Sequence, residues 1–414
     1  MILRNDMLPD GAPRGIEVIQ ITDEPDVPGT HVYMEAQIFT PDSKRFVLHR
    51  SAHPHGSDKN DPEHRYLVCD IENDCELSPV TDELGVTAPS ISPDGETLYY
   101  FVNETETGGG RLTLKSVGLD GTARRTVLVL DEGFPGTDYH PSRIYPLSTI
   151  SSDGMRLAGA GFLADAFVPG AAFGLYVFDL EDATGHVAVE GPTWCNLHPQ
   201  YCRSRDTDAC HDIMIQENHG NEINADGKIV NLTGGTGADI HVVRDDGADM
   251  RSFPWGRDGN EFCQGHQCWR GRSTWAITST GTRDVDEQQL IEGAPVPFAG
   301  HIGLETPGGV RNDLSRDFEG KPEFAHFATD EAGEVFISDY GRGEQSRTVY
   351  LGRLGAPGED PVSDWVCLAD SGCRGQKVAH LHPFLSPDGT KAFFNSDESG
   401  ILQAYMIRGL ENLR

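Results

Sequence analysis

The stretch Phe384-Leu-Ser-Pro-Asp-Gly389 forms a turn signal, and the apolar run Lys391-Ala-Phe-Phe-Asn395 follows it directly. Pro, Asp and Gly favour a tight turn, and an aromatic run bounded by such residues is typical of a buried strand. Similar signals recur about every 50 to 65 residues. The seven copies are Ile38-Phe-Thr-Pro-Asp42, Ile91-Ser-Pro-Asp-Gly95, Ile150-Ser-Ser-Asp-Gly154, Tyr201-Cys-Arg-Ser-Arg-Asp206, Trp269-Arg-Gly-Arg-Ser273, Phe327-Ala-Thr-Asp-Glu-Ala-Gly333 and Leu385-Ser-Pro-Asp-Gly389.

This repeat predicts an all-β protein in which each copy is a small antiparallel sheet. Seven such sheets arranged radially form a seven-bladed β-propeller, which leaves few exposed strand edges and has a central channel. We therefore expect residues 1–414 to form one domain. The apolar segment at residues 15–23 precedes the first turn signal, so we expect it to close the ring as the outermost strand of the last blade.

The chain is strongly acidic, with a net charge of −32 over 414 residues. Phosphate backbones are repelled by such a surface, so we expect no nucleic-acid partner. Only 7 of the 33 basic residues are Lys. Excess carboxylates with scarce Lys resemble the usage of proteins from salt-loving organisms, in which ambient salt screens the self-repulsion.

No run of eighteen apolar residues is present, and the first residues lack an apolar core of signal-peptide length. We therefore expect a cytoplasmic protein with no membrane partner. The chain has nine Cys, and four of them form two pairs that are close in sequence, Cys69 with Cys75 and Cys367 with Cys373. Each pair brackets a short turn and could form a hairpin disulfide in an oxidising compartment. The other five are interpreted mostly as small buried thiols. Nothing in the sequence indicates the oligomeric state.

Histidines near the turn signals indicate a metal site. His380 and His382 are two residues apart, so on a regular strand both would point to the same face. His266 precedes its own turn signal in a matching way, and equivalent positions of a repeat protein converge on a common axis. We therefore expect a divalent metal ion near the centre of the ring.

Several motifs resemble the oligogalacturonate lyases of polysaccharide lyase family 22. They are His198-Pro-Gln-Tyr201, Glu217-Asn-His219-Gly220, Gly265-His-Gln-Cys-Trp269, Ala325-His326-Phe327 and Gln376 with His380-Leu-His382-Pro383. The resemblance runs loosely over nearly the whole chain and is specific only in these motifs. It implies a seven-bladed propeller that cleaves uronic-acid oligosaccharides by β-elimination, with Mn²⁺ or another divalent transition metal as cofactor.

The resemblance also implies roles for individual residues. The metal ligands would be His266, Gln376, His380 and His382, although Gln376 lies one residue farther from the first His than the family spacing allows without a bulge. His219 would be the catalytic base, and His198, at the start of the same blade, is the alternative. We expect His326 to contact the substrate.

The chemistry explains this choice of groups. Removing the proton at C5 of a uronate requires that its carboxylate be neutralised, which a metal ion and Arg side chains achieve, and a neutral His can take the proton. Arg203 and Arg283 are the predicted carboxylate clamps. A non-catalytic, TolB-like propeller that binds proteins is the alternative function. A prolyl-peptidase-type hydrolase would need a Gly-x-Ser-x-Gly elbow, which the sequence lacks.

Overall fold

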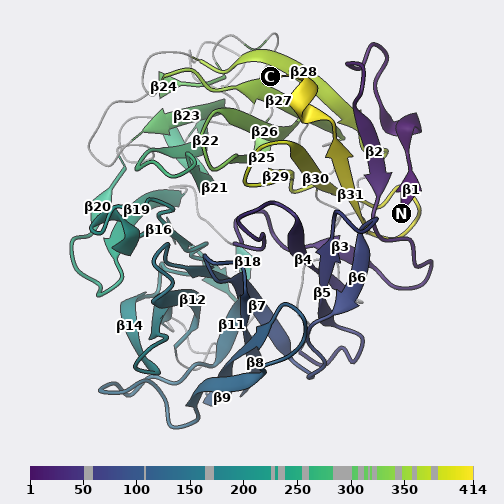
Figure 1. Cartoon of the computed structure of the whole chain (residues 1–414). Helices are drawn as coiled ribbons and strands as arrows, with labels where there is room; N and C mark the ends of the chain where they lie inside the picture. Colours follow the sequence, from purple (N-terminus) through teal and green to yellow (C-terminus); the bar gives the residue numbers. More distant parts are fainter. Residues whose placement is uncertain are drawn as a thin grey trace.

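The fold is a ring of antiparallel sheets, seen in the computed structural model of the chain (Figure 1). The structure describes residues 1–50, 59–106, 109–163, 172–224, 229–231, 238–253, 261–282, 301–305, 312–315, 318, 324–340, 347–356, 361–373 and 381–413. The fold is all-β: within these residues the helices are short 3-10 turns, at Asn5–Met7 (η1), Ala209–His211 (η2) and Leu410–Leu413 (η4). None of these helices has the length and apolar character needed to cross a membrane.

Three blades are separate four-stranded sheets whose strands follow one another in sequence. The first contains β7 (Val86–Ile91), β8 (Thr97–Glu106), β9 (Gly109–Gly118) and β10 (Arg125–Leu130). The second contains β11 (Arg143–Ile150), β12 (Arg156–Phe162), β13 (Phe173–Asp179) and β14 (Thr184–Gly191). The third contains β25 (Phe324–Thr329), β26 (Val335–Tyr340), β27 (Thr348–Arg353) and β28 (Ser363–Asp370).

Two further blades share one sheet because β19 and β21 are joined through a single pair, Ala238 opposite Cys263. One of them contains β15 (Gln200–Tyr201), β16 (Asp212–Asn218), β19 (Ala238–Arg244) and β20 (Arg251–Ser252). The other contains β21 (Glu261–Trp269), β22 (Ala276–Thr282), β23 (His301–Glu305) and β24 (Asn312–Asp313). A separate hairpin, β17 (Glu222–Ile223) with β18 (Ile229–Asn231), follows β16.

The remaining sheet joins the two ends of the chain. Its C-terminal strands are β29 (Phe384–Leu385), β30 (Lys391–Ser396) and β31 (Gln403–Arg408), and β31 pairs with the N-terminal strand β2 (Glu17–Gln20). The strand β1 (Ile2–Leu3) lies outside β2. The same sheet continues through β3 (Gly29–His31) to β4 (Arg45–Arg50), β5 (Arg65–Asp70) and β6 (Glu76–Pro79). Figure 1 shows purple β2 beside yellow β31, so the ring is closed by both ends.

The predicted turn signals form one recurring hydrogen-bonded turn. At Ser92, the backbone N–H donates to the carbonyl of Thr97, and the Ser92 carbonyl accepts from Gly95, both over 2.8 Å. Gly95 has a φ of 78°, a conformation that glycine adopts without steric cost. We call the residue in the place of Ser92 the turn residue. Six turn residues make both equivalent backbone bonds: Thr40, Ser92, Ser151, Arg270, Asp330 and Ser386. Cys202 is the seventh from its N–H bond alone, which goes to the carbonyl of Asp212 over 2.8 Å.

The first strand of four blades is irregular just before its turn. The pairing register breaks between Thr87 and Ser90, and equivalent breaks occur in the strands β11, β21 and β25. Such bulges re-aim side chains that a regular strand would alternate. Counting back four residues from the turn residues gives one position in every blade, which we call position −4. Its occupants are Ala36, Ala88, Leu147, His198, His266, His326 and His382.

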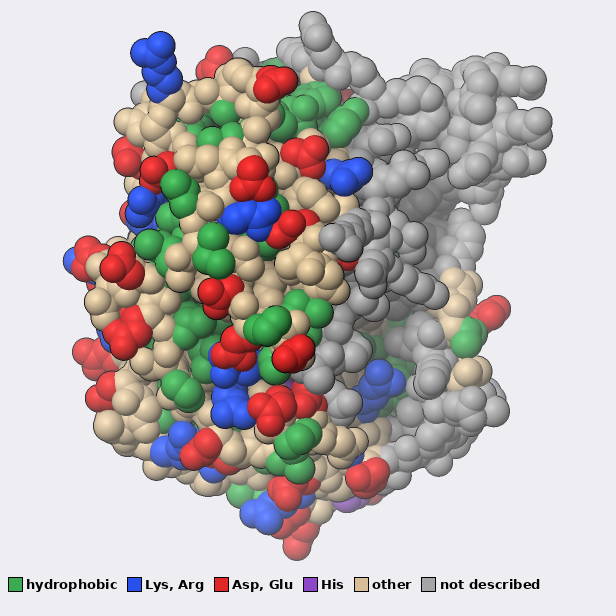
Figure 2. Space-filling model, turned by 90° about the vertical axis from the view of Figure 1, so that its right-hand side faces the viewer, with side chains coloured by type: hydrophobic (Ala, Val, Ile, Leu, Met, Phe, Trp, Pro, Cys, Tyr) green, Lys and Arg blue, Asp and Glu red, His purple; other side chains and the backbone are tan. Residues whose placement is uncertain are grey.

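All nine Cys are free thiols, and eight of them are buried. The disulfides considered for Cys69 with Cys75 and for Cys367 with Cys373 are therefore absent. The thiols of Cys69 and Cys75 contact each other, and this contact, together with burial, raises the pKa of Cys69. On the side of the molecule shown in Figure 2, acidic and basic side chains are interspersed and hydrophobic side chains form small separate groups.

Candidate metal centre and active site

Three imidazoles from three consecutive blades lie in a row. The ring centroids of His266 and His326 are 4.4 Å apart, and those of His326 and His382 are 4.5 Å apart. His326 and His382 are buried, and His266 is partly exposed. All three occupy position −4, so the repeat itself brings them together. We call this set the histidine row.

A buried carboxylate fixes the central imidazole. Oδ2 of Asp339, on β26, lies 2.8 Å from Nδ1 of His326, and its Oδ1 accepts a 2.8 Å hydrogen bond from the His326 backbone N–H. The Asp339 side chain has no exposed surface. The contact from Asp339 to Nδ1 orients the ring so that Nε2 would be the ligating nitrogen, which is the usual arrangement of a metal-binding His.

The end of the row is held in an uncommon backbone conformation. His382 has a φ of 44° and lies before β29, which begins at Phe384. A positive φ interrupts the alternation of side chains, so His382 does not lie on a regular strand. That His380 and His382 share a face stays a prediction. His380 lies outside the described residues, as do Gln376 and Arg283.

The fourth His at position −4 forms a pair with a carboxylate. Nδ1 of His198 lies 2.9 Å from Oε2 of Glu35, and its Nε2 lies 2.9 Å from Nδ2 of Asn196. Burial lowers the pKa of His198, but the charge of Glu35 and the hydrogen bond to it outweigh burial and raise this pKa above its usual value. Among the described residues, the buried Oε1 of Glu35 has no hydrogen-bond partner.

Tyr33 connects this pair to the histidine row. Its ring centroid lies 5.4 Å from that of His198 and 4.6 Å from that of His382. Burial is the main cause that raises the pKa of Tyr33, and the charges of Glu35 and Asp339 raise it further, so its hydroxyl keeps its proton at neutral pH.

Tyr33, Asn196, His198 and His382 are among the residues that line a cavity of about 240 Å³, which we call the histidine cavity. Its wall combines imidazole, phenol and amide groups with apolar side chains. The described residues that line it are His31, Val32, Tyr33, His49, Tyr66, Tyr145, Pro146, Leu147, Asn196, His198 and His382. A cavity of this kind, mostly apolar with a few convergent polar groups, is the usual form of a small-molecule site.

His219 belongs to a second polar cluster, at the end of β16. Its Nε2 lies 2.8 Å from Oδ2 of Asp239 and 3.7 Å from Oε2 of Glu217. His241 reaches the same Glu217 carboxylate over 3.1 Å. Burial opposes ionisation of Glu217, but hydrogen bonds from His241 and Thr193 outweigh it and lower its pKa to about 2. His219 is not among the described residues that line the histidine cavity.

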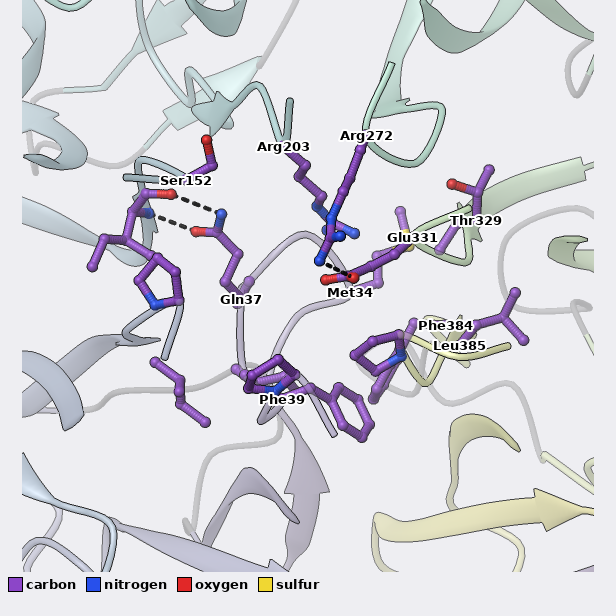
Figure 3. A pocket seen from close by; sticks show the side chains of 18 of the residues that line it. Met34, Gln37, Phe39, Ser152, Arg203, Arg272, Thr329, Glu331, Phe384 and Leu385 are labelled. Carbon is purple, nitrogen blue, oxygen red and sulfur yellow. Dashed lines mark hydrogen bonds and ion pairs between the residues drawn. The ribbon is translucent and has the colours of Figure 1, made fainter. Parts of the chain in front are cut away.

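Arg203 is not among the described residues that line the histidine cavity. It lines a different cavity together with Arg205 and Arg272, and these three guanidinium groups come from the turns of two neighbouring blades (Figure 3). The structure therefore brings together His198, His266, His326 and His382, but it does not bring Arg203 to them.

Among the residues that the structure describes, one other group of side chains could hold a metal ion. Ligand atoms of Asp153, Cys210 and His211 all lie within 4.8 Å of one another. His211 is also bound through Nδ1 to Oδ2 of Asp245, over 2.8 Å. Sequence reasoning interpreted Cys210 as a buried thiol and did not predict this group, because its members share no metal-binding spacing.

Comparison with known proteins adds the fold family. No protein-family model and no curated protein sequence matches the chain. Among solved structures, an oligogalacturonate lyase in complex with manganese matches 96% of this chain and 94% of its own, with a TM-score of 0.68 and 17% identity. An oligogalacturonate lyase from Vibrio parahaemolyticus matches 97% and 96%, with a TM-score of 0.68 and 16% identity. The β-propeller domain of a Pyrococcus furiosus protease matches 92% and 95%, with a TM-score of 0.53 and 10% identity.

Proposed function

Since the chain has the fold of the oligogalacturonate lyases, we propose that it is a metal-dependent lyase that cleaves uronic-acid oligosaccharides by β-elimination. The observation that carries the proposal is the histidine row, with Asp339 behind its central member. A propeller that served only as a protein-binding scaffold would not need three imidazoles in contact at one repeat position.

The metal ligands we propose are His266, His326 and His382 from the described residues, with Gln376 and His380 as further candidates. His326 thus changes role from a substrate contact to a ligand, because it lies between the other two rings. Imidazole nitrogens suit manganese, iron, nickel or zinc and disfavour calcium. When bound, a divalent ion would act as a Lewis acid toward the substrate carboxylate.

His198 is the base that the geometry favours. It lines the same cavity as His382, and Glu35 holds its imidazole by Nδ1. Nε2, which lies 2.9 Å from the amide nitrogen of Asn196, would exchange that contact for the proton at C5. Proton removal at C5 leaves an electron pair that forms the C4=C5 double bond, and the bond from C4 to the glycosidic oxygen breaks. His219 is the second candidate, because Asp239 orients it in a similar way.

Tyr33 is placed to complete the reaction. The departing oxygen needs a proton, and the Tyr33 hydroxyl retains one because its pKa is raised. Tyr33 contacts both His198 and His382, so acid, base and proposed metal ligand border one cavity. The products would be a shortened oligosaccharide and a 4,5-unsaturated uronate.

The test is a screen of oligogalacturonates and other uronic-acid oligosaccharides with the Mn²⁺-loaded protein. A 4,5-unsaturated product absorbs in the ultraviolet, so the absorbance should rise with time for at least one of them. His382→Ala should abolish the rise, and Arg111→Gln, an exposed change on β9 far from the channel, should leave it intact. Absence of any rise in a fully metal-loaded sample would overturn the lyase proposal.

A further inference from the structure

The channel has a second cavity, which differs in character from the histidine cavity. We call it the arginine cavity; its volume is about 130 Å³. All seven blades contribute to it, mostly through residues within three positions of their turn residues. Its basic lining residues are Arg203, Arg205 and Arg272.

Different residues line the two cavities: among the described residues, none lines both of them. Tyr33 borders the histidine cavity and its neighbour Met34 borders the arginine cavity, so this segment lies between them.

The arginine cavity carries unneutralised positive charge in a chain whose net charge is −32. Glu331 is the acidic residue of its described wall, and it pairs with Arg272. Within the described part of the chain, neither Arg203 nor Arg205 forms an ion pair or a side-chain hydrogen bond. In Figure 3 the side chains of Arg203 and Arg272 lie next to each other and point into the cavity. Two adjacent guanidinium groups that repel each other are stabilised by an anion placed between them.

The opposite wall is apolar. Phe39 and Phe384 face the cavity from two blades, and Ile38, Leu385 and Pro387 extend this wall. A carboxylate on a compact ring that has one apolar face would satisfy both walls. A sugar acid has this combination, since its carboxylate suits the planar guanidinium groups and its C–H face suits aromatic and proline rings.

We propose that the arginine cavity is a second carbohydrate site, which binds the carboxylate of a single uronate unit. The inference rests on the proposed function, because the elimination described above releases uronate units into the same channel. The site would hold an acidic sugar on the side of the channel away from the histidine row. The local positive charge would also offset the repulsion between an acidic protein and an acidic ligand.

Isothermal titration calorimetry with sodium galacturonate tests the proposal. The titration uses the His266→Ala/His382→Ala protein, in which binding at the histidine row is removed. EDTA-treated native protein serves as a second sample, in case that variant does not fold. Binding should persist in both samples. When the substitutions Arg203→Gln/Arg205→Gln are introduced into either protein, the affinity for galacturonate should fall by at least about tenfold, as expected for lost hydrogen bonds to a charged group.

Matched controls separate the site from nonspecific charge. Arg65→Gln/Arg111→Gln removes one partly exposed and one exposed guanidinium group that do not line either cavity, and should leave the affinity unchanged. Galactose, which lacks the carboxylate, and acetate, which lacks the ring, should both bind at least tenfold more weakly. Equal affinity for the native and Arg203→Gln/Arg205→Gln proteins, or no binding of galacturonate to EDTA-treated native protein, overturns the proposal. Loss of binding in the arginine variant supports the site even if the protein shows no lyase activity, so the two proposals can fail separately.

Discussion

Replacing Asp339 by Asn tests whether the histidine row holds a metal ion. The buried Asp339 carboxylate contacts His326 twice, at Nδ1 and at the backbone N–H, each over 2.8 Å. Asn keeps the shape and can still accept the backbone hydrogen bond, but it removes the charge that orients the ring and makes Nε2 a better donor to a metal. The substitution therefore weakens the support of one proposed ligand without removing the ligand itself.

The expected magnitude follows from the bond that is lost. A hydrogen bond to a charged group contributes about 1.5–3 kcal/mol and a neutral one about 0.5–1.5 kcal/mol, so the change costs roughly 1–2 kcal/mol. This range corresponds to about a 5- to 30-fold loss of metal affinity. It overlaps the roughly 10- to 100-fold loss that is typical when the hydrogen-bond partner of a metal-binding His is removed.

The assay is calorimetric titration of metal-free protein with MnCl₂, for native protein, Asp339→Asn and Asp239→Asn. Asp239→Asn is the matched control, because it breaks the same kind of 2.8 Å carboxylate–imidazole contact at His219, outside the row. We expect a weaker affinity in Asp339→Asn and an unchanged affinity in Asp239→Asn. Unchanged affinity in Asp339→Asn, with a circular dichroism spectrum that shows intact folding, would refute the reasoning.

Three further outcomes are expected. Glu35→Gln should lower the pKa of His198, which NMR can follow. Because this pKa is raised in the native protein, the His198–Glu35 pair stabilises the fold below about pH 6.5, and the stabilisation is lost as the pH rises through the raised pKa. The variant should lose this pH dependence of stability. His198→Ala should lower the elimination rate by about 10²–10⁴-fold and leave the metal content unchanged. If His198→Ala instead keeps normal activity and His219→Ala shows this loss, the base is His219. If the acidic surface is adapted to salt, the melting temperature should keep rising with KCl beyond about 1 M, where simple screening is complete, and a flat curve would remove that interpretation.

The fold could be predicted from the sequence because its signals are local. Ser-Pro-Asp-Gly turns place glycine where φ is positive, as at Gly95 and Gly389, and the Ser-Ser-Asp-Gly turn does so at Gly154. The strand that follows each turn is apolar because both faces of a blade are buried. The N-terminal strand was expected near residues 15–23, and β2 lies there as Glu17–Gln20. The strand β1 was not predicted, because two exposed apolar residues carry no periodic signal.

The site could be predicted only in part, because bulges decide where its side chains point. His266 and His382 were placed at matching positions before their turns, and counting back four residues from each turn would also have identified His198 and His326 as equivalents. The turn at Cys202 lacks the Pro-Asp-Gly pattern, so its turn residue, and with it the position of His198 four residues earlier, could not be recognised in the sequence. Glu35 and Asp339 carry no motif, since their partners come from other strands and become visible only when the chain is folded.

The most direct test of the central claim is an anomalous difference map from crystals grown with MnCl₂. We expect one strong peak beside the imidazole rings of His266, His326 and His382, and no peak there in crystals of the His266→Ala/His382→Ala variant. A native map without a peak at these rings, or with its only peak at Asp153, Cys210 and His211, would contradict it.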